Sequence, residues 1–333
     1  MPRPHPRRAA PAAVTALLTT FAALVPLTAP APAAHAADNG HWSVFPASSR
    51  LGSRPYFHLA ADPGRRLRDK VTITNRTSAP LTLRLYAADA HNTVRDGGFA
   101  VRSPEERQRG VGAWARPDRT RVTVPARGSV TVAYTVTVPD TAPPGDHPGA
   151  LVALDERVAR PGAAVGMGVR QAVGARLYLR VNGPAVPALT VEDVTVDQDR
   201  PLLPGTGTSR ATVSYTLHNR GNVTLSPRVR LRATGLFGRE LLERPGRVPS
   251  ELLPRQRIRL TERWDGPPAL DRGKVRITAT AHGTRDAAGA SFLAVPRLAA
   301  GLLAAALALA LLWWRTRRAR RTREASGPAA APV

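Results

Sequence analysis

The sequence predicts an all-β protein, with two tandem immunoglobulin-like β-sandwich domains followed by one C-terminal transmembrane helix. Three observations predict this fold class. Apolar and polar residues alternate in many short segments, Pro- and Gly-rich turns separate those segments, and an uncharged apolar run stands near the C-terminus. Alternation with period two is typical of half-buried antiparallel strands, and many short strands with frequent turns are typical of sandwiches.

The first 36 residues have the three parts of a secretory signal peptide: a start with three arginines, an apolar run at 12–27 and an A-x-A cleavage site at 34–36. The Arg7-Arg8 pair also fits twin-arginine export. The residues after it lack the polar and bulky types of that signal, which favours the general secretory route. The mature protein is therefore expected to begin at Ala37, outside the cytoplasm.

Residues 37–183 are predicted to form the first sandwich and residues 184–291 the second. In the first, apolar and polar or small side chains alternate over 81–86 and 130–138. In the second, the same alternation covers 212–217 and 275–280. Turn sequences such as DPG, PARG and PPGDHPG separate these segments, and the break at Asn182-Gly183-Pro184 marks the boundary.

An internal repeat supports two domains of one plan. The segment 71–85 resembles 213–231, each being a strand, an Asn-centred turn and a second strand. The segment 124–136 resembles 252–264, each holding a strand that begins after a proline. Asn75 and Asn222 also begin N-x-T glycosylation sequons, but an Asn that supports a turn is the favoured interpretation.

The uncharged run at 298–314 is predicted to be a transmembrane helix. As a helix it would be about 25 Å long, against about 30 Å for the hydrocarbon core of a bilayer. The arginines that follow it belong on the cytoplasmic side. We therefore expect a single-pass cell-membrane protein with an extracytoplasmic N-terminus and a basic cytoplasmic tail at 315–333. The LPxTG match at 203–207 lies far from the C-terminus and is interpreted as a loop.

Composition narrows the function classes. There is no cysteine, which excludes disulfides, thiolate metal sites and cysteine nucleophiles, and favours a bacterial envelope protein. All but two of the 48 basic residues are arginine, so codon usage in a high-GC genome accounts for part of the net charge of +24. For an exported chain the polyanions within reach are peptidoglycan, teichoic polymers and anionic lipids, and no nucleic acid is expected as a partner.

No motif indicates an enzyme. The eight histidines stand singly, without metal-ligand spacing, and no nucleophile elbow, phosphate-binding loop or dinucleotide fingerprint occurs. Asp155 and Glu156 are neighbours, so on a strand they would point to opposite faces and could not share a substrate. The sequence therefore predicts no catalytic residue, no metal site and no cofactor.

Trp114 and Arg116 form the first candidate binding site. They lie in an irregular insertion at 91–118 between predicted strands. Long loops on sandwiches often carry binding functions, and a ring beside a guanidinium would stack on a sugar or peptide. The alternative is that Trp114 covers the edge of the core.

Arg228, Arg230 and Arg232 form the second candidate site. Their spacing of two places them on one face of a predicted strand, with Arg257, Arg259 and Arg276 on other strands. A row of arginines of this kind would bind a polyanion. The alternative is a solvated outer face.

The first domain resembles the WxL-interacting proteins of Gram-positive bacteria, in their N-terminal peptidoglycan-binding domain. The resemblance is carried by residues 57–98, by VPARGSVTVAYTVTVPDTAPPGDHPGALVAL at 124–154 and by QAVGARLYLRVNG at 171–183. The order of signal peptide, two sandwiches, membrane helix and basic tail is also similar. The resemblance implies peptidoglycan binding by the first domain and binding of a secreted surface protein by the second. The chain contains no W-x-L motif, so it would be the receptor.

The resulting hypothesis is a non-enzymatic cell-surface protein that binds peptidoglycan or another anionic wall polymer and scaffolds a secreted partner. One alternative is a membrane-tethered adhesin or assembly chaperone that binds a protein partner by strand addition to a sheet edge. Another is the accessory subunit of an enzyme.

Overall fold

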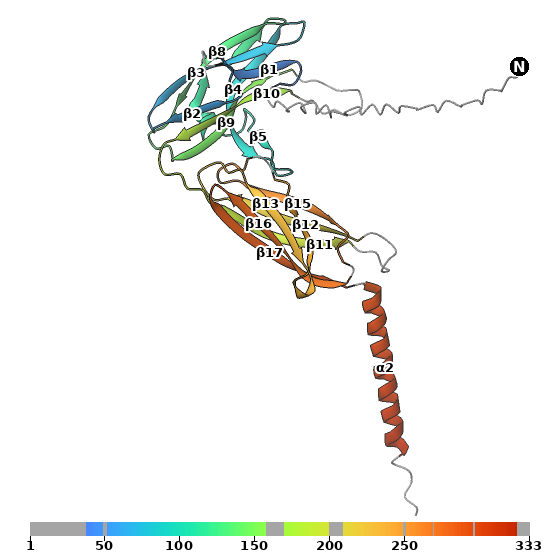
Figure 1. Ribbon diagram of the computed structural model, residues 1–333. Coiled ribbons are helices and arrows are strands. Elements are labelled where there is room, and N and C mark those ends of the chain that lie inside the picture. Colours follow the sequence, from blue (N-terminus) through green and yellow to red (C-terminus); the bar gives the residue numbers. More distant parts are fainter. Residues whose placement is uncertain are drawn as a thin grey trace, which may run out of the picture. The chain divides into compact units, whose positions relative to one another are not determined.

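The computed structural model describes residues 38–48, 52–157, 170–199, 209–248, 251–268, 270–295 and 297–324. Most of these residues are in β-strands, which form four sheets arranged as two sandwiches (Figure 1). The all-β prediction is therefore confirmed. The predicted signal peptide, the LPxTG match and the last part of the tail lie outside the described residues.

The described part of the first sandwich contains ten strands in two sheets. One sheet has the order β1-β3-β8-β6, and the other has the order β2-β10-β9-β4-β5, with β7 also paired to β4. The strands are β1 (Trp42–Pro46), β2 (Phe57–Ala61), β3 (Arg66–Asn75), β4 (Leu81–Asn92), β5 (Phe99–Val101), β6 (Ala115–Pro117), β7 (Arg121–Val124), β8 (Ser129–Thr137), β9 (Gly145–Leu154) and β10 (Ala172–Val181).

The chain changes sheet between its first two strands. β1 pairs antiparallel with β3, whereas β2 pairs parallel with β10 at the edge of the other sheet. Apolar residues of both sheets face inward and are buried, and Phe57 packs edge-on against Tyr134 with ring centroids 5.2 Å apart. The exchange places β2 beside a strand that lies more than 110 residues further along the chain.

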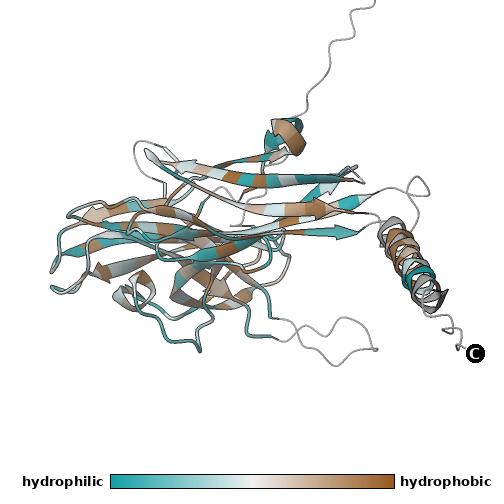
Figure 2. Cartoon of the chain, turned by 90° about the horizontal axis from the view of Figure 1, so that it is seen from below, coloured by the Kyte–Doolittle hydropathy of each residue, from teal (hydrophilic) through white to brown (hydrophobic). Residues whose placement is uncertain are grey.

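The second sandwich has a three-stranded and a four-stranded sheet, with the orders β11-β12-β15 and β14-β13-β16-β17. Figure 2 shows how hydrophilic and hydrophobic residues alternate along the strands. The inward side chains include Tyr215, Trp264 and Phe292, all buried in one core. The strands are β11 (Leu189–Asp199), β12 (Arg210–Asn219), β13 (Arg228–Thr234), β14 (Glu240–Pro245), β15 (Arg257–Asp265), β16 (Asp271–Ala281) and β17 (Thr284–Ala294).

Two buried asparagines hold equivalent turns in the two sandwiches. The Asn75 side-chain amide donates to the backbone carbonyls of Ala79, Val124 and Pro125 at 2.8–3.2 Å. Asn219 repeats this pattern, and its amide nitrogen donates to three backbone carbonyls at 2.8–3.2 Å. These networks explain why an Asn-centred turn recurs in the sequence. They also occupy the Asn75 amide, in keeping with the turn interpretation of its sequon.

The described residues also form three helical segments: α1 (Val111–Trp114), the 3-10 turn η1 (Leu236–Gly238) and α2 (Arg297–Glu324). The run at 298–314 lies inside α2 and is helical, as predicted. Within the described residues, no helix combines the length and the apolar character needed to cross a membrane. The transmembrane assignment of 298–314 therefore stays a prediction.

Candidate functional site

The outer face of the sheet β14-β13-β16-β17 is strongly basic. On β13, Val229 and Leu231 are buried, so Arg228, Arg230 and Arg232 point outward and are exposed. The strand register adds cations from the neighbouring strands, because paired residues of an antiparallel sheet share a face. We call this surface the cationic face; its basic residues are Arg228, Arg230, Arg232, Lys274, Arg276 and Arg285.

Like charges lie directly beside each other on the cationic face. Arg232 is the register partner of Arg276, an arrangement that costs stability unless counterions offset it. Two carboxylates on β14 provide part of this compensation. Glu243 lies 2.5 Å from Arg230, and Glu240 lies 2.9 Å from Arg232. The hydrogen bond from Arg230 lowers the pKa of Glu243 below its ordinary value, so this carboxylate is ionised at neutral pH.

The cationic face is hollowed. Arg228, Arg230, Arg232, Arg276 and Arg285 line a depression of about 1120 Å³. The hydroxyl side chains of Thr278 and Thr280 form part of its floor. The uncompensated cations and this shape suit an extended anionic ligand better than a compact one.

The structure separates the predicted arginines into two groups. Arg276 lies beside the three arginines of β13, because it is the register partner of Arg232. Arg257 and Arg259 belong to β15, which is in the other sheet of the sandwich. Arg257 there contacts the carboxylate of Glu192 at 3.7 Å. Arg285 was not singled out from the sequence, because only the β16–β17 register brings it beside the β13 row.

Trp114 and Arg116 occupy different environments. Trp114 ends α1, is half-buried and packs against the core of the first sandwich. Its ring lies 4.6 Å from that of His147. Arg116 is exposed on the short strand β6, opposite Thr135. The indole is therefore largely used in packing, and neither residue belongs to the cationic face.

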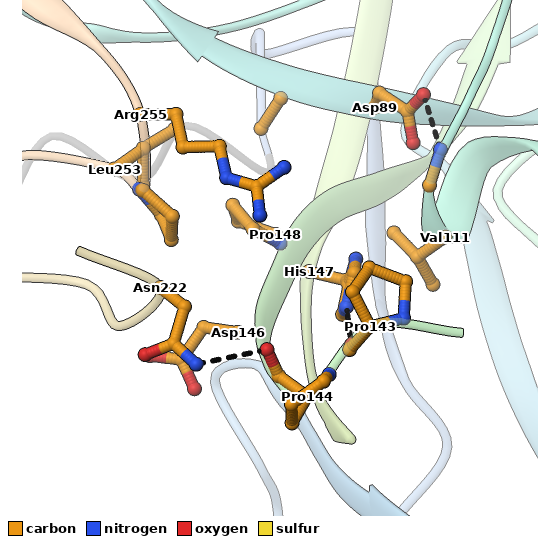
Figure 3. A pocket seen from close by; sticks show the side chains of 13 residues that line it. Asp89, Val111, Pro143, Pro144, Asp146, His147, Pro148, Asn222, Leu253 and Arg255 are labelled. Carbon is orange, nitrogen blue, oxygen red and sulfur yellow. Dashed lines mark hydrogen bonds between the residues drawn. The ribbon is translucent and has the colours of Figure 1, made fainter. Parts of the chain in front are cut away.

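His147, the ring partner of Trp114, lines a small hollow of about 160 Å³ to which both sandwiches contribute (Figure 3). Asp146 and the prolines beside His147 form one side, and Asn222, Leu253 and Arg255 form the other. The side chains of Asp89, Asp146, His147 and Asn222 in this hollow already have hydrogen-bond partners. Asp89 accepts backbone hydrogen bonds from Gly110 and Gly112 at 2.9 and 2.7 Å, and His147 bonds the Pro143 carbonyl at 2.8 Å.

Specific hydrogen bonds join the two sandwiches around this hollow. The Asn222 amide donates to the Pro144 carbonyl at 3.0 Å, and the Thr224 amide donates to the Asp146 carboxylate at 2.8 Å. At the end of β4, the Asn92 side chain donates to the Glu251 carbonyl and accepts from the Leu253 backbone N–H, both at 2.9 Å. Sequence patterns give no signal for these contacts, which pair residues 78 to 161 positions apart.

The described residues contain no cluster of three or more His, Asp or Glu side chains suited to a metal ion. The ring of His58 lies against those of Tyr56 and Tyr178, and the ring of His147 lies against that of Trp114. The cationic face and the aromatic side chains of the first sandwich offer positive charge, ring surfaces and hydrogen-bond donors, which are groups typical of binding sites.

No protein-family model and no curated protein matches this chain. Solved structures similar to it include the class 5 fimbriae chaperone CfaA, with TM-score 0.34, 10% identity, 77% of this chain covered and 100% of that chain. The CupB2 chaperone of Pseudomonas aeruginosa has TM-score 0.28, 11% identity, and coverage of 70% and 96%. The CsuC–CsuE chaperone–tip adhesion subunit complex of Acinetobacter baumannii has TM-score 0.32 and 10% identity, with 62% of this chain and 86% of that chain covered. Similarities this low assign neither a family nor a function to the chain.

Proposed function

We propose that this chain is a non-enzymatic cell-surface protein that binds an anionic cell-wall polymer through the cationic face of its second sandwich. The observation that carries the proposal is the set of outward cations on β13, β16 and β17, which exceeds the carboxylates beside it. Guanidinium groups bind phosphate and carboxylate as planar forks, with charge-assisted hydrogen bonds.

The spacing of the cations favours a polymer over a single anion. Alternate residues on a strand are about 7 Å apart and adjacent strands about 5 Å apart, so the face repeats its donors in two directions. A chain of regularly repeated anions can satisfy several of them at once. For an exported protein, teichoic polymers and the carboxylates of peptidoglycan are the polyanions of this kind.

Export and membrane anchoring belong to the same proposal. They are supported by the sequence, in which a signal-like leader precedes the sandwiches and the uncharged run 298–314 precedes a cluster of arginines. Held in this way, the two sandwiches would lie between membrane and wall. N-terminal sequencing of the purified protein, together with protease treatment of protoplasts, tests this part; an uncleaved leader or a protected ectodomain would refute it.

The binding proposal is tested with purified walls, with and without teichoic acid. The triple variant R228E/R230E/R232E should sediment with teichoic-acid-bearing walls at least tenfold more weakly than the wild type. A matched control, R210E/R259E/R263E, makes the same change of net charge on the exposed positions of β12 and β15 and should bind nearly as well as the wild type. Wild-type binding should weaken with salt, because exposed charges are screened over about 8 Å at physiological ionic strength. Equal losses in both variants would leave only unspecific charge attraction.

A second candidate function is that of an assembly chaperone or adhesin that binds a partner by strand addition. The observation that favours it is the position of β2, which is the outermost strand of its sheet and contains neither proline nor a lysine, arginine or carboxylate. Sheet edges without such features accept an added strand. One similar solved structure is a chaperone in complex with a tip adhesin. A photo-crosslinker at Ala60 in β2 should then capture a secreted protein that a crosslinker at Ala133 in β8 does not; equal capture would exclude this edge.

A further inference from the structure

The turn η1, which connects β13 and β14 in the second sandwich, presents apolar side chains to solvent. Leu236 is exposed there, and the ring of Phe237 is fully exposed. Phe237 is the most exposed large apolar side chain in the described part of the chain. One exposed apolar residue is ordinary, so the neighbours of this turn decide whether it has a role.

The buried carboxylate of Asp271 on β16 holds this turn in its conformation. One oxygen accepts from the Leu236 backbone N–H at 2.9 Å, and the other accepts from the Arg239 guanidinium at 3.1 Å. The Gly235 N–H donates to the Arg239 carbonyl at 2.8 Å. Phe237 has a left-handed backbone with φ 58, a conformation that residues with a Cβ adopt only where the surrounding structure imposes it. The ring is therefore held outward by a fixed turn.

Two further exposed leucines lie at the same end of the sheet. Leu270 directly precedes Asp271, and Leu293 on β17 is the register partner of Arg272. Both leucines are therefore neighbours of the residue that holds the turn. We call this exposed apolar set the apolar rim; its members are Leu236, Phe237, Leu270 and Leu293.

The apolar rim lies where the chain leaves the sandwich for α2. Asp271, which holds the turn, is the register partner of Ala294, the last residue of β17. Because α2 begins at Arg297, at most about 10 Å of extended chain separates it from the end of β17. The uncharged run 298–314 follows at once. If that run enters a bilayer, the rim must lie close to the bilayer surface.

We propose that the apolar rim is a second membrane contact, in which the Phe237 ring and its neighbouring leucines enter the outer leaflet of the lipid bilayer beside α2. Apolar side chains of interfacial segments enter the boundary between head groups and acyl chains by about 5–10 Å, with cations above them. Arg272 and Lys274 are exposed on β16 beside the rim, and their charge suits the phosphates of lipid head groups.

This contact has a consequence for the rest of the molecule. A single helix would leave the second sandwich free to turn about the helix axis. A second contact with the bilayer limits that rotation, so it fixes the direction in which the cationic face points. The inference rests on the membrane anchoring in the proposed function, because the rim reaches a bilayer only if α2 is inserted in one.

The test uses fluorescent labels at single cysteines, since the natural chain contains none. The full mature chain, labelled with the fluorophore NBD, is reconstituted in vesicles of equal parts phosphatidylcholine and phosphatidylglycerol. Nitroxide lipids in both leaflets then quench labels that touch the bilayer. A nitroxide near the lipid head group should quench F237C at least about twofold, and one at the end of the acyl chain should quench it less, because the contact is shallow.

Two labels serve as controls. Val94 is an apolar residue of the first sandwich, 84% exposed and outside the rim, so V94C should remain unquenched. L307C lies within the run 298–314 and reports whether α2 is inserted.

A further pair of variants keeps Phe237 in place, since the fluorophore is itself apolar. A label at L270C should also be quenched, and adding F237S should reduce this quenching by about half. Equal quenching of L270C with and without F237S would overturn the inference.

The outcomes separate the rim from the anchor. If L307C is quenched but F237C and L270C behave like V94C, the rim contact is wrong and the anchoring stands. A blue shift of F237C without quenching by lipid would show that a protein surface covers the rim, and would also overturn the inference. If L307C is not quenched, the anchoring is wrong and the rim contact is wrong with it. Wall sedimentation of R228E/R230E/R232E tests the cationic face independently of all these labels.

Discussion

Tyr178 and Glu251 are 73 residues apart in the sequence, and the phenol of the first donates a hydrogen bond to the carboxylate of the second at 2.8 Å. Tyr178 belongs to the first sandwich, whereas Glu251 lies between β14 and β15 of the second. Burial raises the pKa of Tyr178, so the phenol keeps its proton and remains a donor throughout the physiological pH range. The stacked His58–Tyr178 pair thus lies beside a point where the two sandwiches are joined.

The Y178F variant tests this joint. It removes the donor, but Glu251 keeps Arg176 at 3.6 Å, so its carboxylate is not left without a partner. We expect the free energy of unfolding in urea to fall by about 1.5–3 kcal/mol, the usual net value of a hydrogen bond to a charged group. Y86F, which changes a β4 tyrosine, serves as the control and should have little effect. An equal loss in both variants would show that the Glu251 bond has no special weight.

The buried asparagine turns give a prediction for each sandwich. N75A and N219A would each leave several buried carbonyl groups and a backbone amide without their side-chain partner. Each variant should lose about 3 kcal/mol of unfolding free energy, because each buried group without a partner costs about 1–3 kcal/mol. Chemical denaturation followed by tryptophan fluorescence measures this loss.

The control for the asparagine turns is N182A. Asn182 is exposed and its side chain makes a single bond to Asp62 at 2.7 Å, so its removal should cost at most about 0.5 kcal/mol. If N75A or N219A lost no more unfolding free energy than N182A, the buried asparagine hydrogen bonds would not stabilise the turns.

Glu192 predicts a pH dependence of stability. Hydrogen bonds from Arg220 and from His218 lower its pKa to about 2. A glutamate in the unfolded chain titrates near 4.3, so the carboxylate contributes stability above about pH 4.3 that is lost as the pH falls toward 2. E192Q should therefore be less stable than the wild type at pH 7 and equal to it at pH 2. Urea midpoints across this range test the prediction.

Glu240 provides the comparison for Glu192. Its carboxylate is about half exposed and forms a surface ion pair with Arg232, so E240Q should change the midpoint little at either pH. A parallel response of both variants would mean that general charge, rather than the Glu192 contacts, sets the acid limit.

Trp114 is predicted to act mainly through packing. W114A removes a half-buried indole that contacts the core and His147, and should destabilise the first sandwich by about 2 kcal/mol, below the 3–5 kcal/mol of a fully buried Trp. W114F should recover part of this stability. Wall sedimentation of W114F then tests the sugar-stacking hypothesis: a folded variant that loses wall binding would place Trp114 in the binding site after all.

The alternation of residues along each segment was sufficient to predict strands and the side of each strand that faces the core. Arg228, Arg230 and Arg232 lie on one exposed face as predicted, because a period of two does not depend on which strand lies next to them. The Asn-centred repeat likewise indicated a recurrent turn, since the same short-range hydrogen bonds from Asn75 to Ala79 and from Asn219 to Val223 occur in both copies.

The partners of each strand were decided only by the tertiary structure. Arg276 and Arg285 join the β13 row, whereas Arg257 and Arg259 go to another sheet, although all four alternate in the same manner. His58 stacks on Tyr178 because β2 changes sheet and pairs in parallel with a strand far along the chain. Period and turn chemistry are local properties of the sequence, while register and sheet order depend on which buried faces fit together across long distances.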